Sequence, residues 1–369
     1  MPIWTDLLVK RSPGATAFAD ATLNHLELYV GNAIARAAEL TECYGFEPIA
    51  TSGSLGGESE FFSIALRQGS IALVLTEPRA GGHPGQAFLA AHGDGVVDIA
   101  LRVNDARAAF EQSIQRGAQP VSAPGGGAPS AIRAFGDVRH SFVQPPAGTG
   151  GALFLPGFPT IDASAGQGGT GLELVDHVAV CLPAGDLVQV VALYESALDL
   201  RVVFEERIVV GTQAMLSQVV QNTSRTLTLT LIQPDPAADP GQIDDFLGKN
   251  CGAGVQHIAF STPDVVRTVA ALAERGVEFL QTPAAYYPMQ EQRLTLAKHS
   301  TQDLRELNIL VDQDQDGQLF QIFARSTHPR RTLFFEVIER LGARTFGSGN
   351  IRALYKAVEA DRSATQVNA

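Results

Sequence analysis

Two histidines and one glutamate stand within strongly apolar segments in the second half of the sequence. His177 lies in VDHVAVCL, His257 lies in GAGVQHIAF, and Glu336 lies in RTLFFEVIER. The apolar patterning predicts that these segments are buried β-strands. A carboxylate in such a strand costs considerable free energy unless a cation compensates for it. Two neutral imidazoles that converge with this carboxylate are typical ligands of a divalent metal ion.

Each of these residues alone has a simpler interpretation. A single histidine in an apolar strand is more often a core residue that is hydrogen-bonded to a carbonyl group. Glu339 competes with Glu336 for the role of carboxylate ligand, although it lies at the polar end of the strand. Two symmetrically placed histidines together with a carboxylate in an apolar strand favour a metal site, with Glu336 as the third ligand.

The strands that carry the histidines belong to a repeat in the sequence. LNHLELYV at 23–30 matches VDHVAVCL at 175–182, and GDGVVDIAL at 93–101 matches GAGVQHIAF at 252–260. Segments with helical periodicity and β-branched strands follow at corresponding places in both copies. We therefore predict a duplicated α+β module, with two βαβββ units in each copy.

The first copy lacks the complete set of ligands. At the matching positions it has His25, Asp98 and, further along, Gln144. One imidazole, one carboxylate and one amide are a poor set for a transition metal. We expect the first copy to be a scaffold whose site has degenerated and the second copy to be catalytic.

The composition is that of an acidic globular protein. The 369 residues suffice for two domains, and the net charge is −12 with a pI near 5.1. Such a chain offers no basic surface to nucleic acid. No apolar run predicts a membrane span, and the N-terminus lacks the apolar core of a signal peptide. Cys43, Cys181 and Cys251 show no CxxC spacing, so we expect a cytoplasmic protein with reduced thiols.

Stretches rich in Gly and Pro divide the chain. We expect an N-terminal extension at 1–20, a first domain at 21–150, a linker at 151–170, a second domain at 171–362 and a polar tail at 363–369. Helical periodicity from Asn350 onwards predicts a C-terminal helix. The apolar positions of this helix are Ile351, Leu354, Tyr355 and Val358.

Two other motifs do not predict binding sites. DQDQDG at 312–317 matches the start of a calcium-binding loop, but its twelfth position is Phe323 instead of Glu. The glycines of APGGGAPS lack the Lys and Ser or Thr of a phosphate-binding loop. We interpret the first motif as a hairpin turn and the second as a loop.

Four segments of the second half resemble one known family. GAGVQHIAF, GQLFQIF, STHPRRTLFFEVIER and FGSGNIRALYKAVE are similar to segments of the 4-hydroxyphenylpyruvate dioxygenases, which have the vicinal-oxygen-chelate fold. The resemblance extends over nearly the whole chain. It implies two curved open barrels, Fe(II) held by His177, His257 and Glu336, and a homodimer. It further implies that the C-terminal helix covers the site. It also implies O2 as co-substrate and a 2-oxo acid that is itself decarboxylated, without external 2-oxoglutarate.

Two departures from the dioxygenase pattern favour a smaller branch of this family, the 4-hydroxymandelate synthases. The dioxygenases typically have GNF in the C-terminal helix, where this chain has GNI with Ile351. They have Pro-Leu-Asn-Glu-Pro where this chain has TLIQP, so Thr230 replaces Pro and Ile232 replaces Asn. Synthases hydroxylate the benzylic carbon, which gives 4-hydroxymandelate for antibiotics that contain hydroxyphenylglycine. The dioxygenases attack the ring and form homogentisate.

The resemblance also implies a set of substrate-binding residues. Without it, each glutamine in this set is equally well an ordinary surface amide. The alternatives to a synthase are a homogentisate-forming dioxygenase, a glyoxalase-like metal isomerase that consumes no O2, and a ligand-binding protein without a metal triad. The expected substrate-binding residues are Ser217, Thr230, Gln242, Gln256, Gln321, Phe346, Asn350 and Ile351.

Overall fold

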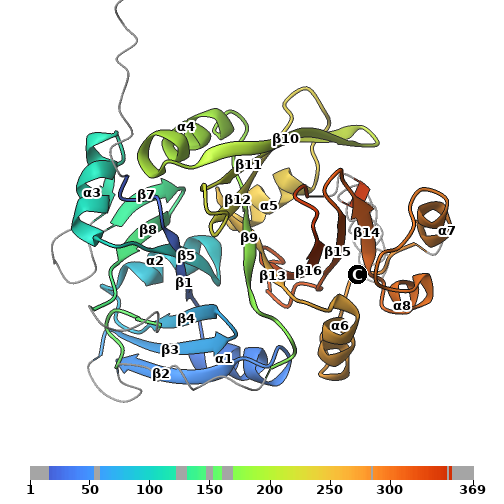
Figure 1. Ribbon diagram of the computed structural model, residues 1–369. Helices are drawn as coiled ribbons and strands as arrows, with labels where there is room; N and C mark the ends of the chain where they lie inside the picture. Colours follow the sequence, from blue (N-terminus) through green and yellow to red (C-terminus); the bar gives the residue numbers. More distant parts are fainter. Residues whose placement is uncertain are drawn as a thin grey trace, which may run out of the picture.

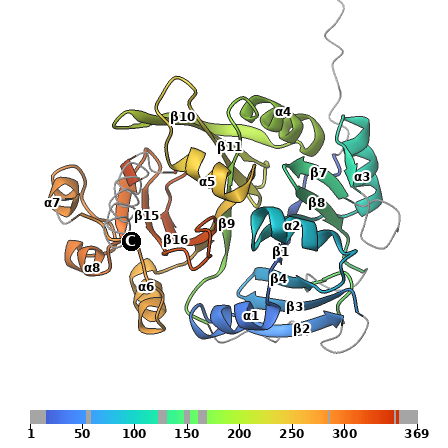
Figure 2. The same ribbon diagram turned by 180° about the vertical axis from the view of Figure 1, so that it is seen from behind.

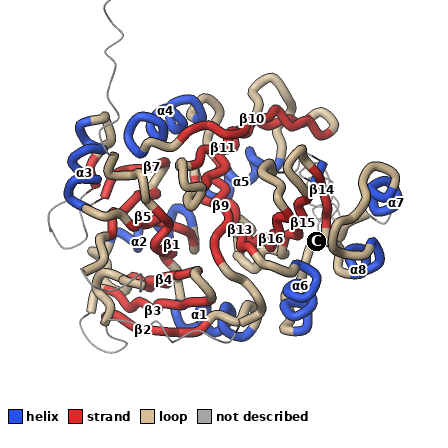
Figure 3. The backbone as a smooth tube through the Cα atoms, viewed as in Figure 1, coloured by secondary structure: helices blue, strands red, loops and turns tan. Residues whose placement is uncertain are grey.

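The fold consists of two curled β-sheets that lie side by side, as Figures 1 and 3 show. The structure is a computed structural model. It describes residues 16–53, 59–121, 131–146, 153–159, 169–283, 286–346 and 349–350. Within these residues, no helix has the length and apolar character that a membrane crossing requires.

The first sheet has eight strands in the order β2-β3-β4-β1-β5-β8-β7-β6. The strands are β1 (Thr22–Tyr29), β2 (Glu47–Gly53), β3 (Phe61–Gln68), β4 (Ile71–Pro78), β5 (Gly95–Arg102), β6 (Pro120–Val121), β7 (Ala131–Phe135) and β8 (Val138–Val143). The helices of this half are α1 (Ala33–Glu42), α2 (Pro84–His92) and α3 (Ala106–Gln115).

The second sheet has eight strands in the order β10-β11-β12-β9-β13-β16-β15-β14. The strands are β9 (Leu174–Cys181), β10 (Arg201–Val210), β11 (Gln213–Gln221), β12 (Thr228–Pro234), β13 (Gly254–Ser261), β14 (Leu310–Gln313), β15 (Gln318–Phe323) and β16 (Phe334–Leu341). The helices are α4 (Leu187–Leu198), α5 (Gln242–Asn250), α6 (Val265–Glu274), α7 (Tyr286–Glu291) and α8 (Thr301–Glu306).

The two sheets have the same topology, which confirms the predicted duplication and the α+β class. The central strands run antiparallel, β1 beside β5 in the first sheet and β9 beside β13 in the second. Each central strand also has a parallel neighbour, namely β4, β8, β12 or β16. Each βαβββ unit therefore closes on its own first strand, and two units join at the centre of each sheet (Figure 2).

Helices α3 and α6, which occupy corresponding places in the two copies, begin in the same way. Asp105 caps α3 and Asp264 caps α6, and each side chain accepts a hydrogen bond from the backbone N–H three residues further on. Helix α6 then buries Val265, Val269 and Leu272, at the i, i+4 and i+7 positions that form one helical face.

One apolar core extends across both sheets. Tyr44, which follows α1, packs edge-on against Phe335 of β16 with ring centroids 5.0 Å apart, and Phe46 lies 5.8 Å from Phe260 of β13. Phe18, within the predicted N-terminal extension, is buried in the same core. The end of the extension therefore packs onto the first domain, and the two domains share their packing.

In the first sheet, an ion-pair network occupies the place that corresponds to the predicted metal site. Arg139 of β8 donates from Nε to Asp98 Oδ2 and from Nη2 to Glu27 Oε2, both at 2.7 Å. The backbone N–H of Ser141 donates to the other oxygen of Asp98 at 3.0 Å. The guanidinium supplies the positive charge that two largely buried carboxylates require. The carboxylate that replaces a histidine in this copy therefore serves an internal ion pair.

Strand register corrects one match between the copies. In the second sheet, Glu336 lies two residues beyond the partner of His257 on the adjoining parallel strand. In the first sheet, the residue two beyond the partner of Asp98 is Ser141. Ser141 therefore corresponds to Glu336, and the match with Gln144 was wrong. The amide oxygen of Gln144 instead accepts a hydrogen bond from the first residue of α3, at 3.1 Å.

Removal of the Arg139 guanidinium should destabilise the protein. In Arg139→Met, Asp98 and Glu27 lose their counter-charge, and breaking a buried ion pair in this way typically costs about 3–5 kcal/mol. We expect the free energy of unfolding, measured by urea denaturation, to fall by an amount in this range. Arg107→Met removes an exposed pair with Glu111 in the same domain and should leave stability unchanged. Equal stability of the two variants would show that the network is dispensable.

Candidate metal centre

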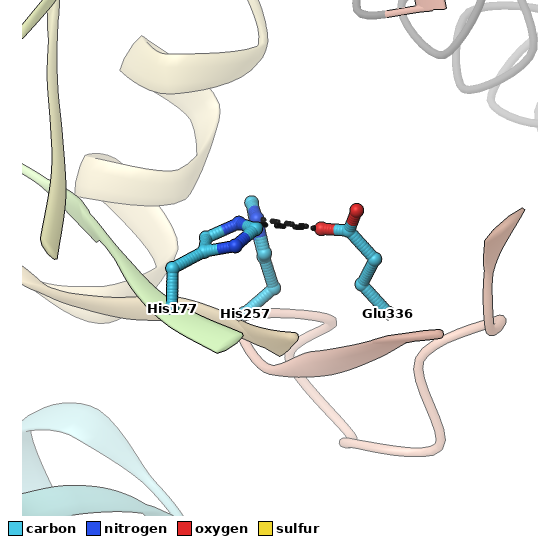
Figure 4. A group of neighbouring side chains, drawn as sticks. All are labelled: His177, His257 and Glu336. Atoms are coloured by element: carbon cyan, nitrogen blue, oxygen red, sulfur yellow. Dashed lines mark ion pairs between the residues drawn. The ribbon is translucent and has the colours of Figure 1, made fainter. Parts of the chain in front are cut away.

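The three predicted metal ligands come together on the second sheet. His177 lies on β9, His257 on β13 and Glu336 on β16, which are three neighbouring strands. Ala259 of β13 stands between them, because it pairs with His177 on one side and with Glu336 on the other. Figure 4 shows the three side chains on one face of the sheet, directed toward one point.

The distances fit a shared metal ion. The Nε2 atoms of His177 and His257 each lie 3.4 Å from Oε2 of Glu336, and the imidazole planes are inclined by 81°. The three side chains are buried, and their donor atoms lie within 4.8 Å of one another. Among the described residues, no lysine or arginine pairs with Glu336. Two nitrogens and one oxygen on one side leave the opposite positions of an ion open.

A β-bulge precedes each of the two histidines. Asp176 and Gln256 are extra residues at the points where the β9–β13 register shifts. A bulge breaks the alternation of side chains between the two faces, so each extra residue can lie beside its histidine. His177 Nδ1 lies 2.8 Å from Asp176 Oδ1, and His257 Nδ1 lies 3.2 Å from Gln256 Oε1. Each Nδ1 thus donates to an oxygen, which leaves Nε2 free to bind a metal.

Asp176 is itself held by Arg340 of β16. Arg340 donates from Nε to Oδ2 at 2.7 Å and from Nη2 to Oδ1 at 2.9 Å, the two-pronged geometry typical of arginine and carboxylate. A chain of hydrogen bonds therefore leads from Arg340 through Asp176 to His177. Sequence reasoning missed both residues, although Asp176 directly precedes the histidine and Arg340 follows Glu336 by four positions.

The electrostatics of the site favour a cation beside Glu336. Burial opposes protonation of His177, but hydrogen bonds with Asp176 and Glu336 raise its pKa to about 9. Burial lowers the pKa of His257. Burial would raise the pKa of Glu336, yet its hydrogen bonds and charge interactions with the two histidines lower it overall. Glu336 is thus ionised. A metal ion that binds here replaces the proton on His177 as the positive charge beside Glu336.

A cavity of about 570 Å³ lies in front of the three ligands. Its volume suits a small organic molecule. Five of the predicted substrate-binding residues contribute polar side chains to its wall, and a sixth, Phe346, contributes a ring. The five are Ser217, Thr230, Gln242, Gln256 and Gln321, and the apolar wall includes Ile208, Met215, Ile232, Ile243, Phe246, Phe323 and Phe334.

Two phenylalanines fix the planes of the His177 and His257 imidazoles. Phe334 stacks on His257 with ring centroids 5.0 Å apart and planes inclined by 24°. Phe346 meets His177 edge-on at 5.0 Å and 88°. The sequence predicted Phe346 at the pocket but gave no signal for Phe334, which falls in the middle of an apolar strand. Aromatic contacts and bulge residues together restrict both histidines.

One polar group of the cavity lacks a partner. The Thr230 hydroxyl on β12 is buried and forms no hydrogen bond with the described residues. A buried unpaired hydroxyl is costly unless a ligand or water satisfies it. Thr230 is one of the residues that line the cavity, so a bound substrate lies near this hydroxyl.

Two predicted substrate-binding residues remain, Asn350 and Ile351. Asn350 is buried, but among the described residues it is not part of the cavity wall. Its amide oxygen accepts a hydrogen bond from the Tyr286 hydroxyl at 2.8 Å, so it fixes the position of the chain beyond β16. Ile351 and the remainder of the predicted C-terminal helix lie outside the described residues.

The competing carboxylate, Glu339, belongs to a separate cluster with Asp264 and His299. Lys298 Nζ lies 2.6 Å from Oε1 of Glu339, and His299 Nε2 lies 2.8 Å from Oε2. The backbone N–H of Val265, at the start of α6, also donates to Oε2 at 2.8 Å. Lys298 already supplies a cation to Glu339, so Glu336 is the better metal ligand of the two.

Comparisons with known proteins agree with this geometry. Residues 174–322 match the Glyoxalase/Bleomycin resistance protein/Dioxygenase superfamily, and residues 30–144 match the family described as hydroxyphenylpyruvate dioxygenase, HPPD, N-terminal. The 4-hydroxyphenylpyruvate dioxygenase of Xenopus tropicalis is 32% identical, over 93% of this chain and 92% of its own length. That of Danio rerio is 34% identical, over 92% of this chain and 90% of its own length.

A solved structure shows the same architecture. A triple mutant of 4-hydroxymandelate synthase from Streptomyces coelicolor superimposes with a TM-score of 0.83 and 39% identity, over 93% of this chain and 99% of that one. The duplicated vicinal-oxygen-chelate fold is thereby confirmed. With relatives matched along nearly their entire length, this chain belongs to the 4-hydroxyphenylpyruvate dioxygenase family.

Proposed function

We propose that the protein is a 4-hydroxymandelate synthase. In this reaction 4-hydroxyphenylpyruvate and O2 give 4-hydroxymandelate and CO2. One oxygen atom enters the carboxylate that remains after decarboxylation, and the other enters the benzylic hydroxyl group. The observation that carries the proposal is the convergence of His177, His257 and Glu336 at the wall of a largely apolar cavity.

His177, His257 and Glu336 are the proposed ligands of Fe(II). When bound, Fe(II) supplies the redox chemistry that activates O2 and the charge that polarises the 2-oxo acid. The protein places all three ligands on one side, so the substrate and O2 approach from the cavity. Because the substrate carries its own 2-oxo acid group, external 2-oxoglutarate is not required.

The cavity suits an aromatic 2-oxo acid. Its apolar wall accommodates an aryl ring and excludes water from the reacting carbon atoms. The unpaired hydroxyl of Thr230 is the proposed partner of the phenol group of the substrate. Four further polar side chains are proposed to orient the polar groups of the substrate, namely Ser217, Gln242, Gln256 and Gln321.

Product choice depends on which carbon of the bound substrate faces the metal site. A displacement on the order of 1 Å changes such a preference. Thr230 and Ile232, the residues that depart from the dioxygenase pattern, both line the cavity. Ile232 lies opposite Ser217 in the β11–β12 register, so the departures concentrate at one wall. This placement and the 39% identity to a synthase support benzylic hydroxylation.

Aerobic turnover of the Fe(II)-loaded protein with 4-hydroxyphenylpyruvate tests the proposal. We expect one O2 consumed for each CO2 released and 4-hydroxymandelate as the main product in chromatography against authentic standards. His257→Ala should abolish turnover, since it removes a metal ligand. Homogentisate as the main product would contradict the synthase proposal but retain the family chemistry. Absence of O2 uptake by iron-loaded protein would contradict both.

Thr230→Val should weaken recognition of the phenol group. The substitution keeps the shape of the side chain but removes its hydroxyl, and the loss of one hydrogen bond corresponds to about a tenfold rise in KM for 4-hydroxyphenylpyruvate. KM for phenylpyruvate, which has no phenol group, should stay unchanged. Thr228→Val is the matched control, because Thr228 lies on the same strand and its hydroxyl already accepts from Gln221. Equal changes for both substrates would contradict the assignment.

A further inference from the structure

Within the part of the chain that the structure describes, the combination of a polar bulge residue and a histidine occurs three times. Asn24 stands at the β1–β5 register shift just before His25, as Asp176 and Gln256 do before their histidines. Asn24 Nδ2 lies 2.8 Å from His25 Nδ1 and also donates to the carbonyl group of Phe154 at 3.0 Å. His25 Nδ1 therefore accepts a hydrogen bond, the opposite of what a histidine that binds metal through Nε2 requires.

The bulge residue before His177 differs from the other two because it is a carboxylate. A carboxylate accepts hydrogen bonds only, so it fixes the proton of His177 on Nδ1. Asp176 is largely buried and has a positive partner in Arg340, whose two hydrogen bonds engage both of its oxygens. The orientation of Asp176, and with it that of His177, thus depends on Arg340.

Arg340 also supports the other side of the same imidazole. Its guanidinium lies 4.9 Å from the ring centroid of Phe346, and this ring meets His177 edge-on. Its Nη1 donates to the carbonyl group of Thr345 at 2.7 Å, directly before Phe346. These contacts therefore form a closed ring that includes one proposed metal ligand, His177. The other members are Arg340, Asp176 and Phe346.

The segment that carries Phe346 is fixed independently of Arg340. Asp314 of the DQDQDG turn accepts hydrogen bonds from the backbone N–H of Arg344 at 2.7 Å and of Thr345 at 2.8 Å. The same carboxylate accepts from Asp316 and Gly317 within the turn, which confirms the predicted hairpin turn. Arg340 thus connects β9, through Asp176, with the segment that carries Phe346. Hydrogen bonds that do not involve Arg340 hold both elements in place.

The closed ring also separates two hollows. His177 and Phe346 line the cavity of the proposed active site, whereas Asp176, Arg340 and again Phe346 line a second groove of about 1310 Å³ with both polar and apolar walls. If these contacts were lost, the buried imidazole of His177 would become exposed to the groove. Arg340 therefore stands at a position where its loss affects both the orientation of a ligand and the exclusion of water.

We propose that Arg340 is a positioning residue of the metal site. By clamping Asp176 and supporting Phe346, it holds His177 in the plane and tautomer that direct Nε2 toward Glu336. The inference rests on the proposed function, because it requires that His177 bind the metal. Residues behind a metal ligand typically contribute about 10- to 100-fold in metal affinity.

The test measures Co(II) affinity by competition with a chelator, together with the visible absorption spectrum of bound Co(II). Arg340→Met and Asp176→Asn should each weaken binding by about 10- to 100-fold and alter the spectrum. Arg340→Lys keeps the charge but loses the two-pronged geometry, so we expect a smaller loss. Arg207→Met is the control, since Arg207 forms a more exposed pair with Asp235 elsewhere in the same domain, and this variant should bind Co(II) like the wild type.

A double variant separates positioning from general stability. If Arg340 acts through Asp176, Arg340→Met combined with Asp176→Asn should lose little more affinity than Asp176→Asn alone. Variants that unfold at a lower temperature but bind Co(II) with wild-type affinity and spectrum would overturn the inference. Wild-type protein that binds no Co(II) would instead contradict the proposed metal site, and the inference with it.

Discussion

The buried carboxylate of Glu336 is the constraint on which the rest of the site depends. It stands among buried apolar residues of β16, and its ionised form needs a positive charge within reach. Two imidazoles are placed beside it by the central strand pair, so the charge comes either from a protonated His177 or from a metal ion. The β-bulges and Arg340 serve this arrangement, because they direct the nitrogen atoms of both rings.

In the first domain, the buried carboxylate receives a nearby positive charge in another way. There, Arg139 brings a covalently attached cation between Asp98 and Glu27, in the place where the second domain has its proposed metal site. The two halves of one duplicated fold thus combine a proposed metal site and an internal ion pair at the same strand positions. This division explains why one copy carries an imidazole where the other carries a carboxylate.

The sequence predicted the elements that depend on local pattern. The duplication, the three ligands and most cavity residues follow from apolar strands with a polar residue at a fixed place, or from the family resemblance. Asp176 was missed because neighbouring residues of a regular strand face opposite sides, and a bulge leaves no mark in hydrophobic periodicity. Gln144 was wrongly matched because parallel strand register depends on tertiary pairing. The cover expected from Asn350 onwards lies mostly outside the described residues.

The measurement that tests the account most directly is anomalous diffraction at the iron edge, from crystals grown anaerobically with Fe(II). The account predicts one strong peak per chain between His177 Nε2, His257 Nε2 and the Glu336 carboxylate. Glu336→Ala crystals treated in the same way should lose this peak. A peak at the cluster of Asp264, His299 and Glu339 in its place, or an iron-loaded protein without density between the three ligands, would contradict the central claim.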